Sequence, residues 1–94
     1  MEYLVEFELD IPGGTADSAV RSRVAAEAIA TANLARQGHL IRLWKRPEES
    51  RAVGLFRADN RAEIDALLAD LPLSDWLHIG VTALVPHPND PKLS

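Results

Sequence analysis

The 94-residue sequence contains no cysteine, which excludes disulfide bonds, thiolate metal sites and catalysis by a cysteine nucleophile. Aromatic residues make up only 5% of the chain, and 10 basic residues stand against 14 acidic ones. The net charge of −4 argues against a general nucleic-acid-binding protein, which normally carries a basic face. No apolar run is long enough to span a membrane and no basic leader precedes the first one, so we expect a soluble cytoplasmic protein.

Recognisable catalytic motifs are missing as well: phosphate-binding loops, dinucleotide fingerprints, metal signatures and serine-hydrolase elbows. The three histidines, His39, His78 and His87, lie far apart, and their spacing does not indicate a metal site. The chain length fits one compact domain, predicted here over residues 1–94. Because so small a domain buries only about 60–65% of its unfolded surface, we expect self-association to add stability.

Alternating apolar residues and turn residues predict four strands, over residues 3–9, 39–46, 51–57 and 77–85. An alanine-rich helix is predicted between the first two strands, with Thr15 or Asp17 as its N-cap and Gly38 just beyond its end near residue 37. Asn60 is predicted to cap a second helix, which Pro72 ends.

This order of elements, βαββαβ, is typical of the ferredoxin-like α+β fold, in which two helices cover one face of an antiparallel four-stranded sheet. The first helix carries small and apolar residues that we expect to face the sheet: Val20, Val24, Ala28, Thr31 and Leu34 or Ala35. The other sheet face also carries apolar residues. We therefore expect a second copy of the chain to cover that face in a homo-oligomer.

Glu27 is the most informative single residue, because its spacing from Val20, Val24 and Leu34 places it on or beside the core-facing side of the first helix. Burial of an unpaired carboxylate is costly and raises its pKa. A carboxyl group with a raised pKa is suited to proton transfer near neutral pH. The alternative is an ordinary surface ion pair with Arg23, four residues earlier in the helix.

The predicted strand 39–46 mixes cationic and apolar side chains, and regular alternation would divide them between its two faces: Leu40, Arg42, Trp44 and Arg46 against His39, Ile41, Leu43 and Lys45. A cation beside an aromatic ring can bind a carboxylate, so Arg42 next to Trp44 is favoured over Lys45. The alternative is an edge strand whose charges discourage aggregation. His78 shares a strand face with Gly80, and a strand glycine can mark a close ligand or tight packing.

The run of residues 36–45 resembles the muconolactone isomerase family, in which a helix-ending glycine precedes a leucine-tryptophan-basic strand. Other segments resemble the family in the same order along the chain: residues 55–56, 71–76 and 87–88. The resemblance implies a ferredoxin-like fold of the dimeric α+β barrel type and a large homo-oligomer. It also implies a cofactor-free reaction of aromatic catabolism, the β-ketoadipate pathway, that shifts a double bond in a γ-lactone from muconolactone to 3-oxoadipate enol-lactone.

The same resemblance implies roles for individual residues. Glu27 matches a family glutamate on the first helix and would be the proton-transfer base. Trp44 and Lys45 match the family's tryptophan and basic residue, and positive groups would hold the carboxylate of a small-molecule substrate. The residues predicted to bind the substrate are these: Arg42, Trp44, Lys45, His39 and His78. No metal and no cofactor is expected.

Some positions depart from the family pattern, and most of them replace polar or aromatic pocket groups: Val24, Leu40, Ile41, Ser50 and Ala52. The leading interpretation is an isomerase-like enzyme acting on a small carboxylated lactone. Two alternatives stay open at this point. One is a cofactor-free oxygenase or cyclase of the same fold that acts on an aromatic substrate, and the other is a non-catalytic oligomeric binding domain.

Overall fold

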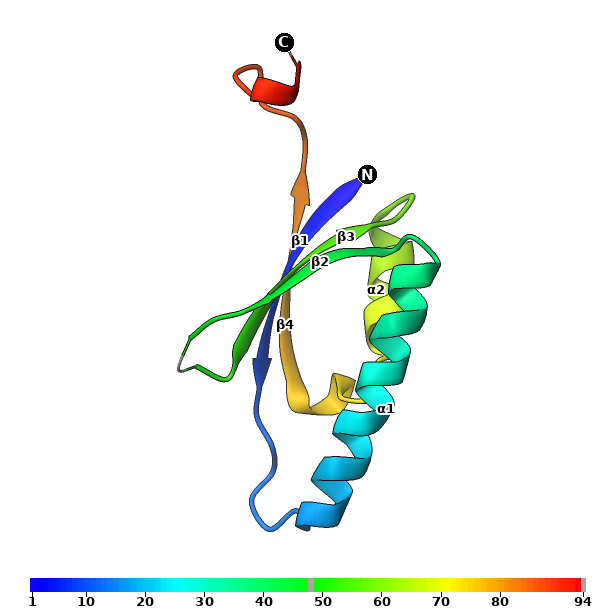
Figure 1. Ribbon diagram of the computed structural model, residues 1–94, viewed down its shortest axis with the longest axis vertical. Coiled ribbons are helices and arrows are strands. Elements are labelled where there is room, and N and C mark those ends of the chain that lie inside the picture. Colours follow the sequence, from blue (N-terminus) through cyan, green and yellow to red (C-terminus); the bar gives the residue numbers. More distant parts are fainter. Residues whose placement is uncertain (48, 94) are drawn as a thin grey trace.

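An antiparallel sheet of four strands carries two helices on one of its faces (Figure 1). The computed structural model describes residues 1–47 and 49–93. Its elements are β1 (Glu2–Leu9), α1 (Asp17–Arg36), β2 (Leu40–Lys45), β3 (Arg51–Arg57), α2 (Arg61–Ala69), the short 3-10 helix η1 (Ser74–Trp76), β4 (Leu77–Leu84) and a second 3-10 helix, η2 (Pro91–Leu93). The strand order is β2-β3-β1-β4, so the predicted ferredoxin-like α+β fold is confirmed.

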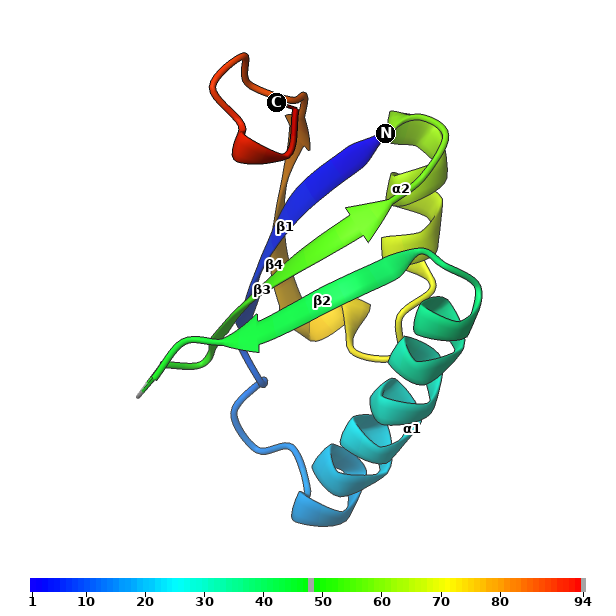
Figure 2. The same cartoon turned by 45° about the horizontal axis from the view of Figure 1, so that its top comes forward.

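Alternate residues of the central strand β1 point to opposite sides of the sheet, as its sequence predicts. Tyr3 and Val5 are buried on the side that α1 and α2 cover, which we call the helix-side face. They pack there with Phe56 of β3 and with Ile64 and Leu68 of α2. Neither α1 nor α2 lies over the opposite side, which we call the bare face (Figure 2). The buried core therefore lies between the sheet and α2.

Helix α1 contributes much less to this core than its length suggests. Its only buried residue is Leu34, close to the C-terminal end, while Val24 remains 47% exposed. The N-terminal half of the helix extends beyond the end of the sheet (Figure 1). The prediction that the whole stripe of α1 packs on the sheet is therefore wrong, since Leu34 is the member of the stripe that is buried.

The two ends of α1 differ in how their free backbone N–H and carbonyl groups are hydrogen-bonded. Ala16 is the N-cap and makes no side-chain hydrogen bond, while the Thr15 hydroxyl donates to a loop carbonyl at 2.6 Å. The predicted side-chain cap is therefore wrong. Gly38 adopts a φ of 83°, and the N–H of His39 donates to the carbonyl of Leu34 at 2.9 Å. This is a Schellman ending, which requires the left-handed conformation that glycine adopts without strain.

A bulge in β2 decides which of its side chains reach the helix-side face. Leu40 lies opposite Phe56 of β3, but Arg42 lies opposite Leu55, so Ile41 is an extra residue in the ladder. The prediction of regular alternation along this strand is wrong, because the extra residue changes the faces of the residues before it relative to those after it. Arg42 and Trp44 point to the bare face: their partners, Leu55 and Val53, alternate with the core residues of β3. Leu40, Leu43 and Lys45 point to the helix-side face.

Helix α2 begins and ends near the residues that the sequence indicates. Asn60 caps α2 as predicted, accepting a hydrogen bond from the N–H of Glu63 at 2.9 Å. The helix is over before Pro72, and η1 then leads directly into β4. Among the residues described, neither α1 nor α2 is long and apolar enough to cross a membrane.

Candidate functional site

A cavity of about 280 Å³ lies between α1 and the helix-side face of the sheet. Its walls come from α1, from all four strands and from the segment between α2 and η1, and they are mainly apolar: Phe7, Val24, Leu43, Phe56, Leu71 and Leu77. Thr31 and Glu27 are the polar lining residues in the part of the chain that the structure describes. Glu27 is thus the one ionisable group that this cavity presents to a ligand.

The cavity explains why part of the apolar stripe of α1 is not buried. Val24 and Ala28 line the cavity instead of packing against the strands, and both are exposed. Apolar side chains around an open space are typical of a ligand site, because a bound molecule would remove them from water. Part of the stripe that predicts a packed helix therefore borders an open cavity here.

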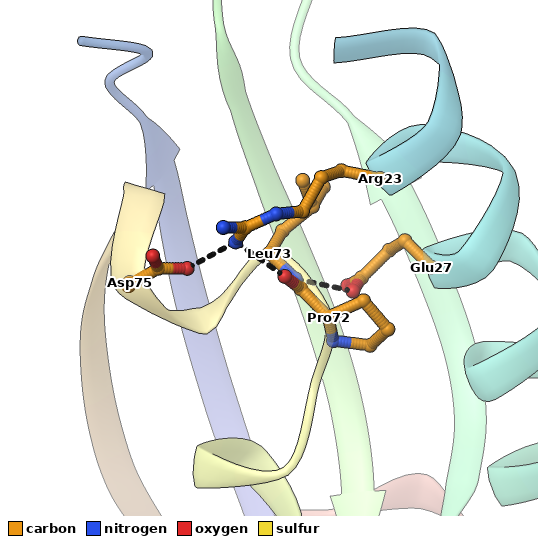
Figure 3. A network of polar contacts seen from close by, with 5 residues as sticks. All are labelled: Arg23, Glu27, Pro72, Leu73 and Asp75. Atoms are coloured by element: carbon orange, nitrogen blue, oxygen red, sulfur yellow. Dashed lines mark hydrogen bonds and ion pairs between the residues drawn. The ribbon is translucent and has the colours of Figure 1, made fainter. Parts of the chain in front are cut away.

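The carboxylate of Glu27 is held by the backbone of the segment after α2 (Figure 3). Its Oε1 accepts a hydrogen bond from the N–H of Leu73 at 3.1 Å. Arg23 pairs with Asp75 instead, at 2.5 Å, and it also donates to the carbonyl of Pro72 at 3.0 Å. The alternative interpretation, a surface ion pair between Glu27 and Arg23, is therefore wrong.

Two opposing influences act on the Glu27 carboxyl group. Partial burial raises its pKa above the ordinary value, because the apolar surroundings disfavour the charged form. The hydrogen bond from the Leu73 N–H favours the carboxylate and offsets part of this effect. The net direction is upward, which brings the pKa of this carboxyl group closer to neutral pH, as a general base or proton shuttle requires.

Arg42 and Trp44 do not share the cavity with Glu27, because the sheet lies between them. They form a pair of their own on the bare face, with the Arg42 guanidinium carbon 5.0 Å from the centroid of the Trp44 ring. Trp44 is 44% exposed. Within a single chain, a ligand seated beside Glu27 is therefore not in contact with this cation.

Lys45 is the predicted cation that lies on the same side of the sheet as Glu27. It is opposite Ala52 in the ladder and borders a groove that adjoins the cavity. Phe7 and Ala52 line both spaces, so the groove continues the cavity toward the β2–β3 hairpin. The sequence favours Arg42 over Lys45, but the bulge reverses this preference for any pocket that contains Glu27.

The two predicted histidines lie outside the cavity. His39 follows the end of α1, and its Nδ1 is 2.8 Å from the carbonyl oxygen of Arg57. His78 lies opposite Glu8 on the bare face, with its Nε2 3.5 Å from a carboxylate oxygen of Asp10. Over the described residues, no group of three or more histidine or acidic side chains could hold a metal ion.

Sequence reasoning does not find two contributors to this site. One is the N–H of Leu73, a backbone donor 46 positions from Glu27 along the chain. The other is the pairing of Arg23 with Asp75, which are 52 positions apart. Pro72, which follows α2, is a sequence signal for a turn, but it does not reveal which helix the turn meets.

Comparison with known proteins agrees with this architecture. The family model described as muconolactone delta-isomerase matches residues 1–90. The crystal structure of muconolactone isomerase superposes with a TM-score of 0.90 at 22% identity, covering 97% of this chain and 95% of that one. No curated protein sequence matches the chain significantly.

Two further solved structures share the fold at lower similarity. The 5-chloro-2-hydroxyhydroquinone dehydrochlorinase from Burkholderia phenoliruptrix AC1100, in complex with 2,5-dihydroxybenzoquinone, has a TM-score of 0.58 and 13% identity, covering 90% of this chain and 94% of that one. An uncharacterised NIPSNAP domain protein from Burkholderia xenovorans has a TM-score of 0.52 and 17% identity, with coverage of 97% and 99%. At these identities the structures show a common fold only. The family model spans nearly the whole chain, and the chain therefore belongs to the muconolactone delta-isomerase family.

Proposed function

We propose that the protein is an isomerase that shifts a double bond in a small carboxylated lactone, in the manner of muconolactone to 3-oxoadipate enol-lactone, with Glu27 as its proton-transfer base. The observation that carries this proposal is the position of Glu27 as the ionisable group of an apolar cavity. The family membership supports the class of reaction.

The proposed reaction needs only one group that takes up and returns a proton. The Glu27 carboxylate removes a proton from a ring carbon conjugated with the lactone carbonyl, and the electron pair of that C–H bond delocalises into an enolate. The resulting carboxylic acid then returns a proton to another carbon of the conjugated system. Atoms and charge balance without a cofactor, and the raised pKa of Glu27 supports both steps.

We assign recognition of the substrate carboxylate to Lys45. A lactone ring in the cavity can extend its carboxylate arm past Phe7 and Ala52 into the groove beside Lys45. An ammonium group there forms a charge-assisted hydrogen bond with the carboxylate. Arg42 faces the other way and does not contribute within the same chain.

Lys45 also favours the isomerase over an oxygenase or cyclase that acts on a polycyclic aromatic substrate. A cation in the groove that continues the cavity suits a ligand that carries a carboxylate, whereas an apolar aromatic ligand offers it no partner. We also propose that the protein acts as a homo-oligomer, because the bare face carries apolar side chains that neither α1 nor α2 covers: Leu4, Val53, Leu55 and Leu84.

The test is turnover of muconolactone by the wild type and by Glu27→Gln, with Glu6→Gln as a matched control on the bare face. Glutamine keeps the shape of Glu27 and can accept the Leu73 hydrogen bond, but it cannot take a proton. We expect Glu27→Gln to lower kcat by about 10²–10⁴-fold and Glu6→Gln to leave it unchanged. Full turnover in Glu27→Gln would end the base role, and an inactive wild type would overturn the proposed substrate.

A further inference from the structure

The structure offers a clear reason for the exact placement of the Leu73 N–H on Glu27. Near Glu27, α1 has no buried side chain of its own, since Leu34 lies about two helical turns further along. The contact between α1 and the segment 72–76 is made largely by Arg23, one turn before Glu27 (Figure 3). The position of the Leu73 donor thus depends on a side chain that does not itself touch the carboxylate.

Arg23 holds this segment at three points. One guanidinium nitrogen, Nη1, donates both to the carbonyl of Pro72 at 3.0 Å and to the carboxylate of Asp75 at 2.5 Å. The guanidinium carbon lies 4.4 Å from the centroid of the Trp76 ring, which is itself buried. These contacts lie on both sides of Leu73 in the sequence, so they fix the backbone from which its N–H points.

We propose that Arg23, together with Asp75, is a positioning residue for Glu27: it locks the 72–76 segment onto α1 so that the Leu73 N–H occupies Oε1 and leaves Oε2 to take the proton of the substrate. Its catalytic consequence rests on the proposed function of Glu27. The positioning itself is a property of the folded chain and is measurable without a substrate.

The charged residues near Glu27 determine what each variant of this contact changes. Arg23 of α1 and Asp75 of η1 are the charged residues at this contact, and they pair with each other. The cavity walls contributed by the strands carry no charged residue among those described. Burial and the Leu73 hydrogen bond are the causes that set the pKa of Glu27, and the bond lowers it. Loss of that bond by itself raises the pKa of Glu27, whereas loss of burial lowers it, so the Leu73 amide is the direct reporter of this contact.

Two variants separate positioning from simple electrostatics. Arg23→Lys keeps the positive charge but loses the planar guanidinium group, whose face stacks on Trp76 while its Nη1 donates to both acceptors. Asp75→Asn removes a negative charge, which by itself would lower the pKa of a nearby carboxyl group. Positioning predicts in addition that the Leu73 N–H is no longer held on Glu27, because the segment loosens. Arg21→Lys, at an exposed position of the same helix, is the matched control.

The measurement is an NMR titration of the Glu27 carboxyl carbon together with amide exchange at Leu73. We expect about tenfold faster exchange at Leu73 and a displaced pKa of Glu27 in Arg23→Lys and Asp75→Asn, with no change in Arg21→Lys. With muconolactone, kcat should fall while KM changes little, and the acidic limb of the pH profile should move with the pKa of Glu27. Unchanged exchange at Leu73 in Asp75→Asn or Arg23→Lys would overturn the proposal. Inactivity of the wild type would count against the proposed function alone, because the titration does not depend on turnover.

Discussion

Charged side chains occur on both sides of the sheet, but their surroundings differ. On the bare face, acidic and basic side chains pair with each other in water, as Arg51 does with Glu8 and Arg57 with Glu2. On the helix-side face, Glu27 is the ionisable lining residue of a cavity among the residues described, and it is partly removed from water without pairing with a cation. The comparison teaches that an ordinary glutamate becomes a candidate base through its surroundings, because desolvation and not residue identity raises its pKa.

The largest expected difference between the two faces is the loss of stability when a side chain is truncated. Two neighbouring residues of β3 that point to opposite faces test it. Phe56 is 1% exposed in the core, whereas Leu55 lies on the bare face. We expect Phe56→Ala to lower the free energy of unfolding by about 3–5 kcal/mol, measured by urea denaturation. Leu55→Ala should cost much less, and its cost should depend on protein concentration if a second copy covers that face. Equal, concentration-independent losses would contradict the distinction between the faces.

A second test concerns the two cations of β2. Lys45→Met should weaken binding of a carboxylated ligand such as muconolactone by roughly tenfold or more, because a charge-assisted hydrogen bond is lost. Arg42→Met removes a cation of the same strand that faces away from Glu27 and should leave the affinity unchanged. Calorimetric titration of both variants decides the matter. A larger loss of affinity in Arg42→Met than in Lys45→Met would indicate that the substrate carboxylate binds on the bare face.

Glycines on the two faces provide a third test. A Cβ added at Gly54 would lie 2.6 Å from Cε1 of the buried Phe56 ring, whereas one added at Gly80 meets nothing within 4 Å. We expect Gly54→Ala to destabilise by about 1–3 kcal/mol through overpacking. Gly80→Ala should be neutral or slightly stabilising, because alanine restricts the unfolded chain. Urea denaturation measures both, and a similar penalty at Gly80 would indicate that the bare face is tightly covered in solution.

The smallest expected effect is the pH dependence of stability that Glu27 causes. Because folding raises the pKa of Glu27, the folded protein binds this proton more tightly than the unfolded chain does. The contribution of Glu27 to stability therefore falls as the pH rises from the ordinary carboxyl value through the raised one. Glu27→Gln removes this dependence, so its stability relative to the wild type should increase over the same pH range. Thermal unfolding at several pH values checks this, and a difference of the opposite sign would show that Glu27 is not desolvated.

Local signals predict most of the fold. Alternation in β1 and β4, the cap at Asn60 and the glycine after α1 all depend on neighbouring residues, and the structure confirms each of them. The position of Glu27 on the inner side of α1 follows from the same helical periodicity. The resemblance to the muconolactone isomerase family also holds over residues 1–90.

The site itself depends on contacts between segments that are distant in the sequence, and local periodicity does not predict such contacts. The bulge at Ile41 arises from the pairing of β2 with β3, and it alone puts Lys45 rather than Arg42 on the side of Glu27. The partner of Arg23 is another such contact, because only the turn after α2 brings Asp75 to α1. The sequence by itself determined the order of the elements and the inward position of Glu27. Tertiary structure decided which groups surround that carboxylate, because packing between separate elements sets burial, hydrogen bonding and therefore its pKa.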